Sequence, residues 1–285
     1  MSPRTATSGA WGLAASTGQD FTHHSIVDAH FEACVETYRK ALDLVGLRPG
    51  WRVLDAGCGP GDFLPWICDL VGPAGAVSAI DLAPENADLA ARRVSESVPG
   101  VAADVRTGDI RELPYPDDAF DAVWCSNTVQ YLDDDSLLRA LAEFRRVTRP
   151  GGLVAVKDLD AQLITVQPGD PDLFADFFRA AAANPGYARQ LRRSGALYRY
   201  LRAAGLESVR QRTLLAEHFA PLTEAAQEFY SRACAQLAAQ IPHGSRTDAW
   251  RVLADPDHPD HPLRSADGYV REGVVLCVGT VPAAQ

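Results

Sequence analysis

Several features that would directly indicate the class or the cellular location of a protein are missing from this 285-residue sequence. No apolar run reaches the roughly 18 residues that cross a membrane, and residues 1–18, rich in Ser, Thr, Gly and Ala, lack the apolar centre of a signal peptide. None of the six cysteines stands in a C-x-x-C pair, and their neighbours are mostly apolar. We therefore expect a cytoplasmic protein without membrane insertion, and buried thiols rather than a zinc site or a disulfide framework.

Positive charge is scarce as well. The chain has 27 Lys and Arg against 37 Asp and Glu, a formal net charge of −10, and only Lys40 and Lys157 are lysines. Because a surface that binds nucleic acid needs positive potential, this balance argues against a nucleic-acid partner. Hydrophobic residues still make up 47% of the chain, which is enough to build the core of one domain, with or without inserts.

Short apolar runs alternate with segments of helical periodicity from Trp51 onward. The pattern predicts strands at 52–56, 77–80, 101–105, 120–125, 153–156, 209–215 and 269–281. It predicts helices that include 84–94, 137–147, 187–204 and 223–240. Strands that alternate with helices form a parallel sheet covered on both faces, so the sequence predicts an α/β fold.

A glycine-rich turn, Gly57-Cys-Gly-Pro-Gly61, follows the first of these strands and precedes a helix. Glycines there let a ligand approach the backbone and the free N–H groups of the helix. Asp62 stands where the dinucleotide fingerprint G-x-G-x-x-G has its third glycine, and an acid would repel a pyrophosphate. A ligand with a cationic centre or an amino group tolerates Asp55 and Asp62 better. A tight turn without a ligand stays open as an alternative.

Two further acids follow the next strands along the chain. Asp81 comes about 20 residues after the turn, where an acid accepts the hydroxyls of a ribose. Asp109 comes after the third strand, where an acid accepts from an adenine amino group. Either acid alone is more often a helix cap or a turn residue, but both fall at the edge where open parallel sheets bind ligands.

Four segments in this order resemble the motifs of class I S-adenosylmethionine (SAM) methyltransferases: VLDAGCGPGDF, AIDLAPE, GDIRELPYPDDAFDAVWCSNTVQYL and RVTRPGGLVAVKD. The small-molecule type, exemplified by the ubiquinone and menaquinone biosynthesis methyltransferases, is the most similar. The resemblance covers Tyr38–Asp158 and returns at Arg189–Leu215 and Tyr269–Pro282. It implies a Rossmann-like, mostly parallel seven-stranded sheet with a final antiparallel strand, SAM as cofactor and S-adenosylhomocysteine as product.

The resemblance also implies which residues would hold SAM. Those at its methionine end would be Tyr38, Gly57, Gly59, Gly61, Ser126 and Asn127. Asp55 would support the turn. At the other end Asp81 would bind the ribose, Leu82 would lie against the adenine, and Asp109 with the N–H of Ile110 would read the adenine edge.

Methyl transfer is an in-line displacement that needs no metal, because the sulfonium is already an activated leaving group. A base is needed only if the nucleophile carries a proton. Our first candidate is His218, placed just after the predicted strand 209–215, and our second is Asp158, at the end of strand 153–156. The remaining candidates are His23, His24 and His30. Many relatives carry a His pair after strand four, where this chain has Gln130 and Tyr131.

The residues beyond the core are expected to form a small helical cap and a lid. We divide the chain into a flexible tail with an N-terminal helix (residues 1–37) and a SAM-binding domain (38–285) with cap inserts at about 161–186 and 220–268. Residues at which an apolar substrate is expected to bind are Tyr131, Phe177, Phe178 and Phe229. Residues 255–262 (DPDHPDHP) are interpreted as a solvated loop rather than a metal site.

The sequence thus predicts a methyltransferase that moves a methyl group from SAM to a small, partly apolar metabolite, in secondary metabolism, as a monomer or homodimer. Two alternatives stay open. One is a SAM-binding cyclase or binding protein of the same fold that transfers no methyl group. The other is an NAD-dependent oxidoreductase, which the glycine spacing disfavours.

Overall fold

A seven-stranded sheet forms the centre of the protein. The computed structural model describes residues 12–14, 20–22, 24–97, 102–183, 186–241 and 247–283. The strand order is β5-β4-β3-β6-β7-β9-β8, with bounds β3 Arg52–Ala56, β4 Ala76–Asp81, β5 Ala102–Thr107, β6 Phe120–Ser126, β7 Thr148–Gln167, β8 Glu207–Phe219 and β9 Tyr269–Thr280. Neighbours from β5 to β7 are parallel, whereas β9 runs antiparallel to β7 and β8. The predicted Rossmann-like fold is confirmed, including its final antiparallel strand.

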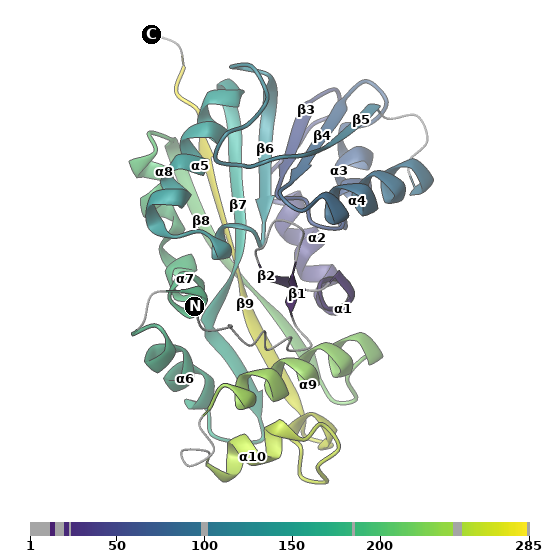
Figure 1. Ribbon diagram of the computed structural model, residues 1–285, viewed down its shortest axis with the longest axis vertical. Helices are drawn as coiled ribbons and strands as arrows, with labels where there is room; N and C mark the ends of the chain where they lie inside the picture. The colour runs from purple at the N-terminus through teal and green to yellow at the C-terminus, as the bar shows by residue number, and fades with distance from the viewer. Residues whose placement is uncertain are drawn as a thin grey trace, which may run out of the picture.

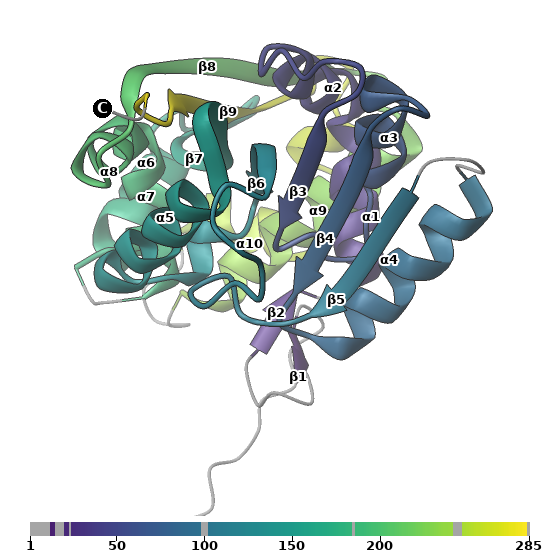
Figure 2. The ribbon, with the colours of Figure 1, turned by 90° about the horizontal axis from the view of Figure 1, so that it is seen from above.

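Helices cover both faces of the sheet (Figure 2). One face packs on α2 (Val35–Asp43), α3 (Leu64–Val71) and α4 (Pro84–Ser97), and the other on α5 (Asp134–Val147) and α8 (Leu197–Ala203). Side chains alternate between the faces, since Val53 lies in the first apolar cluster and its neighbour Leu54 in the second. Among the described residues no helix is long and apolar enough to span a membrane.

Strands β7, β8 and β9 continue well past the parallel part of the sheet and carry the cap (Figure 1). Strand β7 pairs with β9 from Leu153 to Asp160 and again from Thr165 to Gln167, with an irregularity between. The predicted strands at 153–156 and 209–215 were therefore too short. Polar residues such as Asp158 and Asp160 interrupt the apolar pattern, but here they are buried within a continuous strand.

This extension moves two candidate bases away from the places expected for them. Asp158 lies inside β7 rather than at its end, and His218 lies inside β8 rather than after it. The cap insert expected from residue 161 begins only after Gln167, because residues 161–167 still belong to β7.

The helix predicted at 187–204 is broken into α7 (Tyr187–Arg193) and α8 by the 3₁₀ turn Ser194–Ala196. The carbonyl of Gly195 accepts a hydrogen bond of 2.7 Å from the side chain of Gln211 instead of continuing a helix. A Cβ at Gly195 would lie 3.1 Å from Asp160 Oδ2, so the chain passes close to β7 here. Tertiary contacts overrode the helical pattern.

The cap has an apolar cluster of its own. It is built from α6 (Leu173–Ala181), α9 (Glu224–Ala239), α10 (Asp248–Ala254) and the far ends of β7 and β9. Trp250 lies at its centre, with its ring 5.5 Å from that of Phe174 and 5.6 Å from that of Phe177. The loop that follows α10, residues 255–262, is not fully solvated as expected: His261 is buried, and its Nδ1 accepts from Leu263 N at 3.3 Å.

An N-terminal helix, α1 (His24–Ala33), packs against α9 of the cap. One arginine also ties it to the glycine turn, because Arg93 of α4 donates to Asp28 of α1 at 2.8 Å and to Asp62 of the turn. The Arg93 side chain is only 28% exposed, so this bridge is partly shielded from solvent. The middle of α1 is therefore tethered to the ligand edge of the sheet. A short sheet of β1 (Gly12–Ala14) and β2 (Asp20–Thr22) precedes α1.

Replacing this arginine tests the tether. We expect Arg93→Ala to speed amide hydrogen exchange in residues 24–33 about fivefold, since a partly shielded ion pair contributes roughly 1 kcal/mol. Arg92→Ala is the matched control, because Arg92 is the exposed neighbour on the same helix. Equal exchange of α1 in the two variants and the unchanged protein would show that Arg93 does not hold the helix.

Candidate functional site

A cavity of about 700 Å³ lies between the carboxyl ends of the strands and the cap. Many residues predicted for the site line it: Tyr38, Gly57, Gly59, Asp81, Ser126, Asn127, Tyr131, Phe177, Phe178 and Phe229. Among the described residues, the predicted ones outside this lining are Asp55, Gly61, Leu82, Asp109, Ile110, Asp158 and His218. The candidate base His23 lies outside the described residues. The cavity thus joins one wall from the glycine turn to one wall from the cap.

The glycine turn is hydrogen-bonded to β4 on one side, and its other side is open. The N–H groups of Gly57 and Cys58 both donate to the carbonyl of Ile80, at 2.7 and 3.0 Å. Gly57 has φ +78°, and a Cβ there would lie 2.3 Å from the Thr128 side chain. Gly59 has φ +54°, and nothing lies within 4 Å of the position of its Cβ. A side chain at Gly59 would therefore enter the space that the turn leaves for a ligand.

Asp81 closes the turn and faces the cavity. Its Oδ2 accepts from Gly59 N at 2.8 Å, while Oδ1 accepts from Ala83 N at 3.0 Å and Asn86 Nδ2 at 3.1 Å. Burial raises the pKa of Asp81, and these hydrogen bonds oppose the rise. A carboxylate has about four acceptor positions, so room remains for a ligand hydroxyl. Asn86, which also lines the cavity, was missed by the sequence analysis.

Two more acids lie around the turn. Asp55 is buried beneath it, and burial raises its pKa well above the usual range, helped by the charges of Asp81 and Asp62. This favours a neutral acid that supports the turn without facing the cavity. Asp62 does line the cavity. Burial raises the pKa of Asp62 to about 6, although Arg93 lowers it.

The end of β6 presents two polar side chains to the cavity. Ser126 Oγ is buried and has no hydrogen-bond partner among the residues that the structure describes, so it suits a polar ligand atom. Asn127 has φ +51°, a conformation that Asn tolerates better than most residues. Lys157 holds Asn127 there, because its Nζ donates to Asn127 Oδ1 at 2.7 Å and its carbonyl accepts from Asn127 N at 2.9 Å.

The residues expected at the adenine lie apart from the cavity. Arg111 occupies the Asp109 carboxylate, with contacts of 2.6 and 3.0 Å from its guanidinium and 2.8 Å from its backbone N–H. This hydrogen bonding is the main cause of the lowered pKa of Asp109. Ile110 is buried in the second sheet cluster. If these residues bind adenine, they would therefore do so at the surface beside the cavity.

Neither ranked candidate base lines the cavity. Asp158 is buried in β7, where its Oδ1 accepts from Leu159 N at 2.9 Å, and burial raises its pKa to about 7. His218 lies in β8 with its ring 5.2 Å from that of Tyr230. Burial lowers the pKa of His218, the charge of Glu272 raises it, and that of His30 lowers it further.

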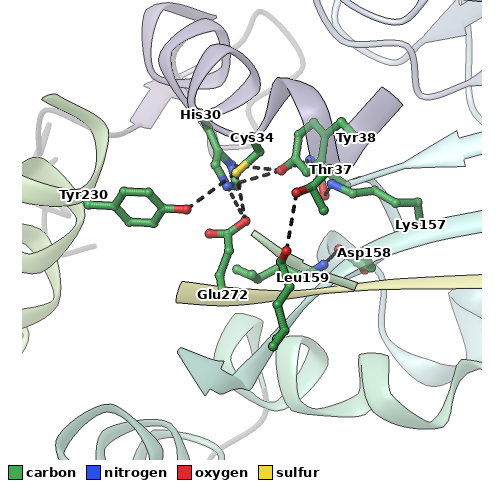
Figure 3. A network of polar contacts seen from close by, with 11 residues as sticks. His30, Cys34, Thr37, Tyr38, Lys157, Asp158, Leu159, Tyr230 and Glu272 are labelled. Carbon is green, nitrogen blue, oxygen red and sulfur yellow. Dashed lines mark hydrogen bonds and ion pairs between the residues drawn. The ribbon is translucent and has the colours of Figure 1, made fainter. Parts of the chain in front are cut away.

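The structure instead gathers a polar network on the cavity wall (Figure 3). Its centre is the buried Glu272 of β9, whose Oε1 lies 2.8 Å from His30 Nε2 and 3.4 Å from Cys34 Sγ. Tyr38 extends it, with its hydroxyl 3.2 Å from His30 Nε2 and 3.4 Å from Asn127 Nδ2. Lys157 Nζ lies 3.3 Å from the centre of the Tyr38 ring.

Burial acts against ionisation throughout this network. It raises the pKa of Glu272, but the electrostatic interaction and hydrogen bond with His30, the charge of Lys157 and the hydrogen bond from Cys34 outweigh it, and the pKa is lowered overall. Burial lowers the pKa of Lys157 to about 7. Burial and the Glu272 charge both raise the pKa of Cys34. The site therefore favours an ionised Glu272 beside a neutral thiol.

Sequence reasoning named His30 among several histidines, but it missed Cys34, Lys157 and Glu272. The only local signal that could have found Lys157 and Glu272 was the presence of a charged residue inside an apolar strand. No local pattern connects His30 with Glu272, because 242 positions separate them. Pairing of β9 with β7 and packing of α1 bring these residues together.

The cap wall is aromatic. The Phe229 ring stacks on His30 with centroids 4.0 Å apart and an interplanar angle of 6°. Phe177 and Phe178 meet edge to face at 5.1 Å, and Tyr131 stacks on Tyr187 at 5.5 Å. Apolar walls with few polar groups are typical of small-molecule sites.

Part of the chain matches a known protein family in sequence. Residues 53–152 match a family described as a methyltransferase domain. The malonyl-[acyl-carrier protein] O-methyltransferase of Serratia marcescens is 38% identical over 122 residues, 43% of this chain and 44% of that protein. The demethylmenaquinone methyltransferase of Lysinibacillus sphaericus is 30% identical over 135 residues, 47% of this chain and 54% of that protein. The matches thus span about half of each relative.

A solved structure extends the likeness to the whole fold. The [4+2]-cyclase SpnF aligns with 86% of this chain and 82% of its own, with a TM-score of 0.51 and 23% identity. This shows a shared fold alone. The sequence matches, the strand order and the glycine turn agree on the family. Residues 53–152 therefore form a class I SAM-dependent methyltransferase domain, and SAM is its cofactor.

Proposed function

We propose that this protein transfers a methyl group from SAM to a small, partly apolar metabolite by in-line displacement. One observation carries the proposal: the glycine turn and the aromatic cap wall line the same cavity. A cofactor held at the turn and an acceptor held by the cap would therefore meet inside one space. A volume of about 700 Å³ falls within the range of small-molecule sites.

The chain's own residues supply positioning. SAM provides a methyl group on a sulfonium, which is already a good leaving group. Asp81 would hold the ribose, and Gly57, Gly59, Ser126 and Asn127 would hold the methionine end. Holding two reactants in line lowers a barrier by up to about 7–11 kcal/mol. The acids that face the cavity, Asp62 and Asp81, favour a cationic ligand over a pyrophosphate.

The cap and α1 would complete the site by excluding water. His30 of α1 lies against Phe229 of the cap, and Phe31 of α1 lies 5.0 Å from the ring of Phe63 beside the glycine turn. This placement supports our division of the chain into a lid within residues 1–37 and a SAM domain with cap inserts. It also supports Phe177, Phe178, Phe229 and Tyr131 as substrate contacts.

A glycine replacement tests the cofactor cradle. Gly59→Ala should cost about 1–2 kcal/mol in stability, because alanine is strained at positive φ, and it should weaken the binding of S-adenosylhomocysteine at least tenfold in titration calorimetry. Gly50→Ala is the matched control: Gly50 has φ +82° and open space around its Cβ position, but it lies outside the cavity lining. Similar melting temperatures with binding lost only in Gly59→Ala are expected.

Two results would contradict this assignment. Unchanged binding in Gly59→Ala would show that the turn does not cradle the ligand. Equal loss in both variants would show that backbone strain alone disturbs the protein.

Labelling tests the reaction. Incubation with methyl-labelled SAM and extracts of small metabolites should transfer label to a compound whose mass rises by one methylene, with S-adenosylhomocysteine formed in equal amount. A product of unchanged mass, formed only while SAM is bound, would favour a non-methylating cyclase. Tight NAD binding without any binding of S-adenosylhomocysteine would favour an oxidoreductase.

A further inference from the structure

We propose that His30, oriented by Glu272, accepts the proton of a hydroxyl group on the methyl acceptor. This inference rests on the proposed function and narrows it. A carboxylate acceptor is already deprotonated and needs no base, whereas a phenol or an enol must lose a proton as its oxygen is methylated. The assignment therefore implies an acceptor with a hydroxyl on a flat, apolar ring.

The contacts of His30 leave one of its ring nitrogens able to accept a proton. Glu272 is 2% exposed, and its Oε1 lies 2.8 Å from His30 Nε2. An ionised carboxylate can only accept, so Nε2 carries the hydrogen and Nδ1 keeps a free electron pair. The Phe229 ring, stacked at 4.0 Å, holds the plane of the imidazole. His30 lines the cavity, so an acceptor in the cavity can approach it.

Tyr38 connects this base to the cofactor side of the cavity. Its hydroxyl lies 3.5 Å from His30 Nδ1 and 3.2 Å from Nε2, and Asn127 Nδ2 donates to it at 3.4 Å. Asn127 directly follows β6, whose carboxyl end we assign to the methionine end of SAM. An acceptor hydroxyl beside Tyr38 would thus lie between the base and the methyl donor.

The reaction balances without any further reagent. The acceptor oxygen gives its proton to His30 Nδ1 and its electron pair to the methyl carbon, and the pair of the broken C–S bond stays on sulfur. The protonated imidazole is then stabilised by the adjacent, buried Glu272 carboxylate. This pair carries no net charge, so the buried network tolerates the extra proton.

A metal site is the competing interpretation of the same cluster. Ligand atoms of His30, Cys34 and Glu272 lie within 4.8 Å of one another. Cys34 Sγ, however, is within hydrogen-bond distance of Glu272 Oε1 at 3.4 Å and of the Tyr230 hydroxyl at 3.5 Å. A thiol satisfied in this way favours hydrogen bonding over metal coordination, which needs a thiolate. Metal analysis separates the two.

Several titratable groups surround His30. They come from every element that faces it: Cys34, Tyr38, Lys157, His218, Tyr230 and Glu272. The Glu272 carboxylate can only accept a hydrogen bond from the imidazole, whereas the Tyr38 hydroxyl can donate or accept. The tautomer of His30 is therefore the direct readout of its orientation by Glu272.

The first experiment needs no substrate. In protein labelled with ¹⁵N-histidine and saturated with S-adenosylhomocysteine, long-range ¹H–¹⁵N spectra should show the Nε2–H tautomer for His30. The hydrogen bond to Glu272 should shift the Nε2–H proton of His30 downfield, and Glu272→Gln should reduce this shift, because an amide oxygen accepts more weakly than a carboxylate. An Nδ1–H tautomer, or an Nε2–H proton that Glu272→Gln leaves unchanged, would overturn the proposal.

The second experiment uses the acceptor found by labelling. His30→Gln should lower kcat about 10²–10⁴-fold and flatten the acidic limb of the rate profile, with the affinity for S-adenosylhomocysteine unchanged and partial rescue by added imidazole. His258→Gln, outside the cavity, is the control and should keep normal rates. Normal turnover by His30→Gln would refute the base but leave the methyltransferase assignment intact. Bound metal in purified protein, lost in Cys34→Ala, would overturn the proposal in favour of a metal site.

Discussion

A buried carboxylate that must stay ionised governs the arrangement of this site. Glu272 lies within β9 at 2% exposure, where an unpaired charge would be costly. A hydrogen bond from His30 and the nearby Lys157 stabilise the carboxylate, and both lower its pKa against the effect of burial. Because these residues come from α1, β7 and β9, the charge balance depends on the correct packing of all of them. Loss of one partner would leave a charge in an apolar wall.

The long strands make this arrangement possible. In a shorter sheet, β7 and β9 would end near the glycine turn and the cap would have no support. Here β7 runs from Thr148 to Gln167 and β9 from Tyr269 to Thr280, so the same strands line the cofactor edge and the cap cavity. The cap is thus an extension of the sheet rather than a separate unit resting on it.

The fold followed from local patterns in the sequence, and the cofactor from the resemblance of its motifs to those of a known family. Gly57, Gly59 and Asp81 are separated by short, regular distances and fall at strand ends, so apolar periodicity was enough to place them beside one another. The strand boundaries failed where polar residues are buried, as at Asp158 in β7. Lys157 and Glu272 were missed for the same reason, since a charge in an apolar strand has no meaning until its partner is known. His30 could be named but not chosen, because nothing along the chain connects it with residue 272.

A crystal structure with S-adenosylhomocysteine bound tests the central claim most directly: one cavity holds the methyl donor and the base. We predict that the ribose hydroxyls contact Asp81 and that the sulfur faces the cavity near Asn127, with His30 on the opposite side of the acceptor space. A sulfur turned away from His30, or a ligand bound outside the glycine turn, would contradict the account.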